Sequence, residues 1–169
     1  EAAVLELLGG DMGDVAKLLA QESERDVEDQ AANGSLYAAL QNMSVMQKVK
    51  LARVGGKEAR ALLIKDRNRI VAASVLGSPK LSETEVIAFT QNRSIGEELL
   101  RIIGNKRDWT KNYKIKLALV TNPKTPQPMA VKFINFLQDK DLRSLMKSRD
   151  VPSNISAHAR RNLTKKGKL

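Results

Sequence analysis

Apolar positions recur at spacings of three and four along most of the chain, which is the period of an α-helix. The segment from Val45 to Ala52 has this pattern, and Ser44 before it and Gly55-Gly56 after it predict where the helix begins and ends. Further short helices are predicted at 59–64, 70–76, 99–103, 130–137, 142–146 and 155–163. The β-branched run 115–120 and the position of Val71 are the weakest helix predictions. No stretch alternates with period two for long enough to predict a strand, so we expect an all-α fold.

Polar residues with capping chemistry stand before several of these segments. Ser82 and Glu85 form the pattern of a capping box, in which a hydroxyl and a carboxylate each satisfy a free backbone N–H at the helix start. The same logic predicts helix starts at Ser94 with Glu97, Thr125 with Pro126, Asp139, and Ser153.

The turns between helices resemble one another. Each offers Ser, Asn or Asp, then a few mostly polar residues, then a small residue or Pro. The turns at Asp66 and Asn92 lie 26 residues apart with one turn between them, and so do those at Asn122 and Ser148. Two short helices per unit at such a period are typical of an α-solenoid, in which stacking supplies the burial that a lone helix lacks.

Three stretches carry a family resemblance: Val120-Thr121-Asn122-Pro123-Lys124-Thr125-Pro126, then Leu137 to Arg143, then Ser148-Arg149-Asp150-Val151-Pro152. Together they resemble the leucine-rich repeat variant, a relative of the HEAT and armadillo repeats. The clear resemblance covers about 117–160, and a degraded version extends back to about 60, while the turn at 105–109 departs from it. The resemblance implies a right-handed α-solenoid of short antiparallel helix pairs with a binding face and no catalysis.

Charge divides the chain of 169 residues unevenly. Residues 1–34 hold nine acids and two bases, whereas the remaining 135 residues hold 27 bases and 10 acids. We therefore expect an acidic leader at 1–35, weakly helical or flexible, a helical repeat domain at 36–163 and a basic tail at 164–169. One hypothesis is that the leader folds over the basic face and competes with its ligand. The chain begins with Glu rather than Met, and we expect it to be a fragment or a processed form.

The basic residues are the main functional signal. Clustered cations bind phosphate backbones through charge and counterion release, without reading sequence. The simpler explanation, that Lys and Arg only keep a repeat protein soluble, is satisfied equally well by a balanced surface. We therefore predict a polyanion-binding face, with nucleic acid, DNA or RNA, as the favoured ligand, formed by Lys48, Arg53, Lys57, Arg60, Arg93, Arg101, Lys106, Arg107, Lys111 and Lys114. The alternative is a scaffold that holds an acidic protein in its groove.

The amino-acid composition excludes several other classes of site and function. The absence of Cys excludes disulfides, thiolate metal sites and iron–sulfur clusters, and a single His leaves little for a metal site. Asp108 beside Trp109 is a thin match to helical-repeat DNA glycosylases, because no second catalytic group accompanies them. No apolar run reaches the roughly 20 residues of a membrane span. We expect no enzyme activity, no cofactor, no small-molecule substrate, no membrane contact and a cytoplasmic location.

The few aromatic residues argue against sequence-specific recognition of single strands, which needs exposed rings among cations. Phe89, Phe133 and Phe136 have the spacing of core residues. Trp109 and Tyr113 lie four residues apart among four lysines and arginines. They fit either a surface patch for a base or a partner, or packing between repeats, and packing is favoured because large aromatics dominate cores.

Overall fold

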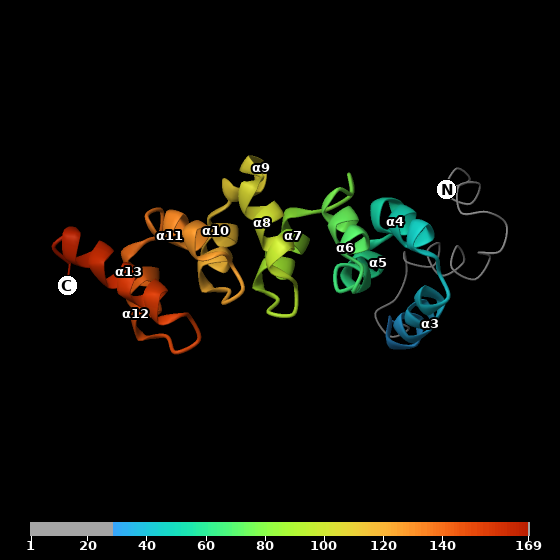
Figure 1. Cartoon of the computed structure of the whole chain (residues 1–169), viewed down its shortest axis with the longest axis horizontal. Coiled ribbons are helices and arrows are strands. Elements are labelled where there is room, and N and C mark those ends of the chain that lie inside the picture. The colour runs from blue at the N-terminus through green and yellow to red at the C-terminus, as the bar shows by residue number, and fades with distance from the viewer. Residues whose placement is uncertain (1–28, 169) are drawn as a thin grey trace. The chain divides into compact units, whose positions relative to one another are not determined.

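The computed structural model describes residues 29–168, with side chains from residue 34 onward, and every element in that range is an α-helix (Figure 1). This confirms the all-α prediction, including for the doubtful run 115–120. Residues 1–28, and with them most of the expected acidic leader, lie outside the described residues. The chain divides into two compact units, and the boundary along the sequence falls between Leu81 and Ser82.

The first unit contains four described helices: α3 (Asp29–Gln41), α4 (Val45–Val54), α5 (Lys57–Leu63) and α6 (Arg69–Leu76). Helix α5 packs against α3, α4 and α6, and α4 packs against α6. The buried side chains that join them include Leu51, Ala59, Leu63, Val71 and Val75. The predicted start at Ser44 is confirmed, because its hydroxyl accepts from the Gln47 N–H and the Gln47 side chain accepts from the Ser44 N–H.

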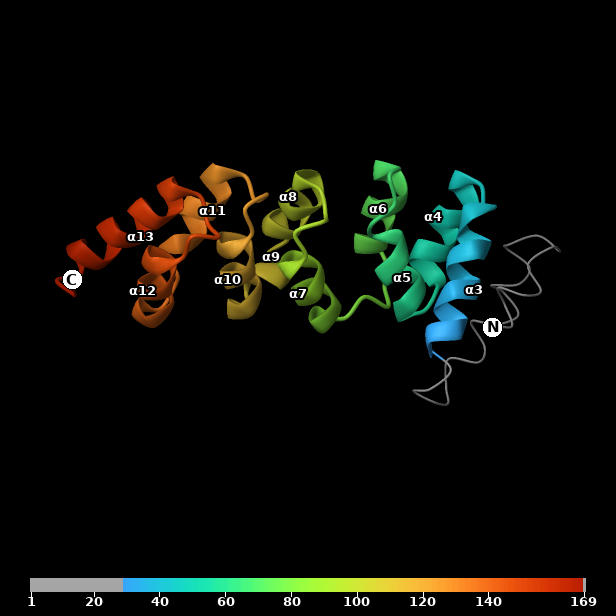
Figure 2. The ribbon, with the colours of Figure 1, turned by 90° about the horizontal axis from the view of Figure 1, so that it is seen from below.

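The second unit contains α7 (Glu83–Gln91), α8 (Glu97–Asn105), α9 (Arg107–Thr110), α10 (Tyr113–Thr121), α11 (Gln127–Ile134), α12 (Asp139–Lys147) and α13 (Ser153–Lys165). Figure 2 shows α7, α10 and α12 in one row and α8, α11 and α13 in a second. The packing partners agree: α7 contacts α8 and α10, α10 contacts α11, and α13 contacts α11 and α12. Leu100, Ile103, Ile115, Leu119 and Ile134 are buried between these helices.

Several predicted helix starts were wrong by one or more residues. The capping box at Ser82 and Glu85 is confirmed. Helix α8, however, begins after Gly96 without a side-chain cap, so Ser94 and Glu97 form no capping box. Helices α11, α12 and α13 follow Pro126, Gln138 and Pro152, so Thr125, Asp139 and Ser153 are not their N-caps. Proline fixes its own φ near the helical value, and this sets the start of α11 and α13 without a capping hydroxyl.

Side-chain hydrogen bonds join turns that are distant in sequence. In the first unit the Ser78 hydroxyl donates to the Arg53 carbonyl, 25 residues away. In the second, the Asn122 amide donates to the Thr90 carbonyl, 32 residues away. Other bonds in this unit span 25 to 29 residues, and their donors are the side chains of Asn112, Tyr113, Asn162, Arg143 and Lys166. Segments 25 or more residues apart are therefore tied together within each unit.

The prediction for one aromatic residue was wrong, and the expected basic tail begins within a helix. Phe89 and Phe133 are buried as predicted, but Phe136 is 57% exposed and is not a core residue. Trp109 is 8% exposed, which confirms its packing role. Helix α13 continues through Lys165, and Lys166 and Lys168 both pair with Asp139, so much of the basic tail is held against α12.

Candidate anion-binding cleft

A cleft of about 960 Å³ opens in the second unit between α8 and the start of α11. Its walls are the end of α8, at Gly104 and Asn105, and the proline-rich segment 123–129. Proline restricts the backbone, so Pro123, Pro126 and Pro128 stiffen one wall. A Cβ atom at Gly104 would lie 2.1 Å from Met129 Sδ, so the absence of a side chain there lets Met129 settle against α8.

Three cations line this cleft: Arg101, Lys124 and Lys132. Arg101 Nη2 lies 2.6 Å from Glu97 Oε1, one turn earlier on α8, and Glu97 is the one acid among the lining residues. Lys132 Nζ lies 5.8 Å from the centroid of the Phe133 ring. All three cations are exposed. The lining therefore carries an excess of positive charge that water reaches freely.

The turn before α11 positions Lys124. The Asn122 side-chain oxygen accepts from the Lys124 backbone N–H at 3.0 Å, and the Asn122 carbonyl accepts from the Thr125 N–H at 3.1 Å. The Asn122 amide is in turn fixed to the Thr90 carbonyl. An Asn that bonds its own backbone two residues on fixes the turn. Lys124 is therefore presented by a buried anchor rather than by a free loop.

The wall and floor of the cleft combine apolar surface with an unsatisfied polar group. Met129, Pro128 and Phe133 supply apolar surface, although Phe133 is only 5% exposed. Thr125 is 8% exposed, and its hydroxyl has no hydrogen-bond partner among the described residues. A buried hydroxyl without a partner costs about 1–3 kcal/mol. The fold therefore leaves the Thr125 hydroxyl buried and unpaired behind this wall.

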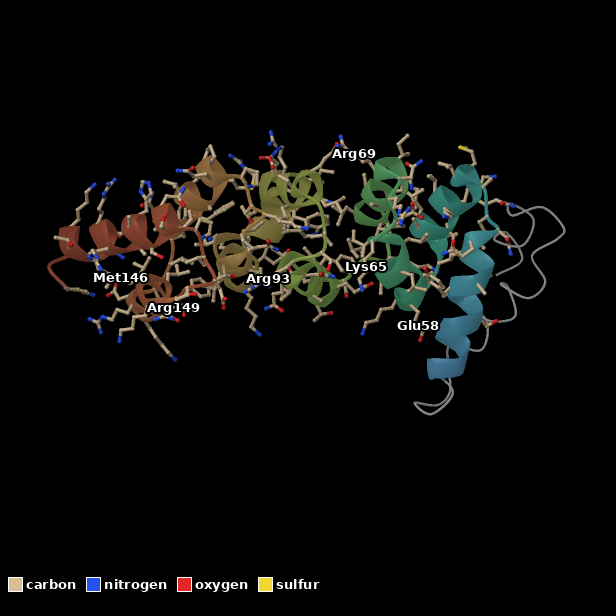
Figure 3. The ribbon with its side chains drawn as sticks, turned by 60° about the horizontal axis from the view of Figure 1, so that its bottom comes forward. Glu58, Lys65, Arg69, Arg93, Met146 and Arg149 are labelled. Atoms are coloured by element: carbon tan, nitrogen blue, oxygen red, sulfur yellow. The ribbon has the colours of Figure 1, made fainter. Side chains whose placement is uncertain are left out.

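A second, smaller hollow of about 340 Å³ lies between α7, α10 and α12. Arg93 and Lys114 line it, together with Asp141 and Asp150. Arg93 extends from the loop after α7, and its Nη2 lies 3.5 Å from Asp150 Oδ2 (Figure 3). The Tyr113 hydroxyl donates to Asp141, and burial together with this carboxylate raises the pKa of Tyr113. Two cations face two acids here, so this hollow has no net attraction for a polyanion.

The other predicted residues of the second unit surround α9. Lys106 Nζ lies 4.0 Å above the Trp109 ring, and Lys111 Nζ lies 3.3 Å from Asp108 Oδ1. Arg107 is exposed. Lys106, Arg107 and Lys111 do not line the cleft between α8 and α11. Of the six predicted residues in this unit, the structure places Arg101 in that cleft and Arg93 with Lys114 in the smaller hollow.

The four predicted residues of the first unit differ in exposure. Arg53 and Lys57 are exposed. Lys48 Nζ lies 2.9 Å from Asp66 Oδ2 in a half-buried pair. Burial alone would raise the pKa of Asp66, but hydrogen bonds from the Asn68 N–H and the Lys48 ammonium outweigh it and lower that pKa. Arg60 is 5% exposed, and its Nη1 donates to the Gly55 carbonyl at 2.7 Å, so it supports the α4–α5 turn and presents little surface.

Sequence reasoning missed Lys124 and Lys132. Lys124 stands inside the Asn-Pro-Lys-Thr-Pro turn of the repeat pattern, and Lys132 is isolated between apolar residues of α11. Neither belongs to a run of cations in the sequence. The turn gave one usable signal, because an Asn two residues before a Lys can accept from the Lys backbone N–H and so fix the turn that carries it.

Neither a group of metal ligands nor a membrane-spanning helix is found in residues 29–168. No group of three or more His, Asp or Glu side chains there is arranged to hold a metal ion. No helix in the described range is long and apolar enough to cross a bilayer.

Comparisons with family models, with curated proteins and with solved structures give no match to this chain. The resemblance to the leucine-rich repeat variant therefore stays a prediction.

Proposed function

We propose that this chain is a non-catalytic helical-repeat protein that binds a polyanion, with the backbone of nucleic acid as the favoured ligand. One observation carries the proposal: three cations and a single acid line the large cleft between α8 and α11. The surrounding unit, residues 82–169, has 18 Lys and Arg against 8 Asp and Glu. Phosphates attract such a surface over the Debye length and release condensed counterions when they bind.

The proposal includes the architecture. The helices of each unit stack as a right-handed α-solenoid related to the leucine-rich repeat variant and the HEAT repeats. Hydrogen bonds that join turns 25 to 32 residues apart support a repeat of about that length. The two rows of helices in the second unit support antiparallel helix pairs (Figure 2). A cytoplasmic location belongs to the same proposal, and cell fractionation tests it.

Fluorescence anisotropy with a labelled random duplex and a labelled single strand, each at several salt concentrations, tests the function. Binding should weaken linearly in log–log salt, with a slope of about −0.9 per phosphate contacted on a duplex and about −0.7 on a single strand. The nucleic acid should be recovered intact, because no catalysis is proposed. Absence of binding at low salt would contradict the proposal.

Variants that remove positive charge test whether the cleft is the surface that binds the polyanion. The double variant Lys124→Gln/Lys132→Gln removes two cations from the cleft lining. It should reduce affinity about tenfold and lower the salt slope by about two contacts. The matched control is Lys140→Gln/Lys147→Gln, two exposed lysines of α12 that do not line the cleft. Equal losses for both pairs would show that net charge matters and the cleft does not.

A second candidate function is a scaffold for an acidic protein. The apolar surface of Met129, Pro128 and Pro123 inside the cleft favours it, because a protein interface combines an apolar centre with a polar rim. Salt distinguishes the two functions, since an interface with an apolar centre loses much less affinity as salt rises than phosphate binding does.

A further inference from the structure

We infer that the cleft between α8 and α11 holds a nucleotide of an unpaired strand, so that the polyanion is single-stranded rather than duplex nucleic acid. This inference rests on the proposed function and narrows its ligand. The cleft holds about 960 Å³, near the top of the range of about 300–1,000 Å³ that is typical of pockets for small organic groups. A phosphate alone needs no cavity of that size, so something larger than a phosphate fits here.

The chemistry of the lining separates into two parts. Met129, Pro128 and Pro126 supply apolar surface against which the flat face of a nucleobase can pack. Arg101, Lys124 and Lys132 surround it with positive charge, which suits the phosphates on either side of that base. A nucleotide carries the apolar face of its base close to an anionic phosphate, and the lining offers a partner for each.

Unpaired hydrogen-bonding groups lie in the same wall. The Thr125 hydroxyl has no partner and its residue is more than nine-tenths buried. Helix α11 starts after Pro126; Pro128 has no N–H, and the Met129 and Ala130 N–H groups both donate to the Pro126 carbonyl at 3.0 Å, which leaves the Gln127 N–H of the first turn for an anion. Gln127 lines the cleft, and its N–H is independent of the three cations and favours an oxygen-rich ligand at this wall.

A duplex cannot use this cleft in the same way. Its bases are stacked and paired, and placing one in a pocket requires flipping it out of the helix, which costs several kilocalories per mole in general. An unpaired strand has its bases free at no such cost. A flat basic surface would bind a duplex equally well, whereas a cleft with an apolar floor favours the unpaired strand.

Anisotropy titrations of the full chain with a strand of about 20 thymidines and with a duplex of equal length test the inference. The strand should bind about tenfold tighter than the duplex. Met129→Ala, which removes apolar floor without changing charge, should weaken binding of the strand about fivefold and leave the duplex unchanged. Met146→Ala, a half-buried methionine of α12 outside this cleft, is the matched control and should change neither (Figure 3).

A crosslinking experiment covers the case in which Met129→Ala fails to fold. A thymidine strand that carries 4-thiothymidine, irradiated with the wild-type chain, should attach within residues 123–133. Attachment confined to other peptides would overturn the inference. An acidic, leucine-containing peptide that binds the wild-type chain more tightly than the strand does and blocks this crosslink would assign the cleft to a protein ligand and overturn the inference as well.

Different results would contradict the proposed function and the present inference. If neither nucleic acid binds at low salt, the proposed function is wrong and this inference falls with it. If the duplex binds as tightly as the strand, or if Met129→Ala weakens both equally, polyanion binding stands and the inference alone is wrong.

Discussion

The side-chain amide of Asn122 donates a hydrogen bond to the backbone carbonyl of Thr90 across 2.7 Å, inside the protein and 32 residues away in sequence. The same amide reaches the Asn92 carbonyl at 3.3 Å, and its oxygen accepts from the Lys124 N–H. One buried side chain therefore ties two turns together and positions a cation of the cleft.

Replacing Asn122 with Ala should destabilise the chain by about 2–4 kcal/mol, because a buried carbonyl loses its donor and the turn loses its internal acceptor. Urea denaturation measures this. Asn105→Ala, an exposed position at the end of α8, should change stability by less than about 0.5 kcal/mol. Equal effects of the two substitutions would contradict the anchoring role of Asn122.

Arg60 and Arg53 are close in sequence, but Arg60 is buried and Arg53 is exposed. Arg60→Ala should cost about 2–4 kcal/mol of folding stability, since it removes a charged donor from the Gly55 carbonyl and leaves a cavity. Arg53→Ala, at an exposed position, should cost less than about 0.5 kcal/mol. Thermal unfolding, monitored by circular dichroism, compares the stability of the two variants. An Arg60 variant as stable as the Arg53 variant would show that the buried bond contributes nothing.

Two phenylalanines of similar sequence context should respond differently to truncation. Phe133 is 5% exposed, and Phe133→Ala should cost about 3–5 kcal/mol through lost burial and the cavity it leaves. Phe136 is 57% exposed beneath Lys116 Nζ, which lies 5.0 Å from its ring centroid, and Phe136→Ala should cost about 1 kcal/mol or less. Chemical denaturation of both variants is the measurement, and similar losses would refute the assignment of Phe136 to the surface.

Asp139 gives a pH-dependent prediction. Hydrogen bonds from the Lys168 and Lys166 ammonium groups lower its pKa below the ordinary 3.8. The stabilisation is therefore present above that pH and is lost as pH falls through the lowered value. In Lys166→Gln/Lys168→Gln the pKa should return toward 3.8, which carboxyl NMR titration measures. The stability difference from the wild type should be present near neutral pH and vanish in acid; a difference that persists there would contradict this linkage.

Local sequence predicted much of the secondary structure. Apolar spacing gave the helices, and Ser44 and Ser82 marked two starts correctly because a capping hydroxyl acts on backbone groups two or three residues away. The same reasoning was wrong at Ser94, Thr125, Asp139 and Ser153. At Thr125 and Ser153 a neighbouring proline fixed the start of the helix, and Asp139 is engaged by Lys166 and Lys168 instead.

The candidate site was predicted less completely. A run of cations marked Arg101, but Lys124 and Lys132 are isolated in sequence and become neighbours of Arg101 through the packing around α8 and α11. Arg60 was included in the predicted site because charge was counted without burial.

The amino-acid sequence by itself determined that the chain is helical, that its charge is strongly positive after residue 34, and that its turns recur. These properties depend on composition and on contacts within one or two helical turns. Tertiary structure alone decided which cations share a cleft, which arginine is buried and which phenylalanine is exposed. Those outcomes depend on the packing of helices against one another, which brings together residues 25 to 32 positions apart and buries Arg60 beside the Gly55 carbonyl.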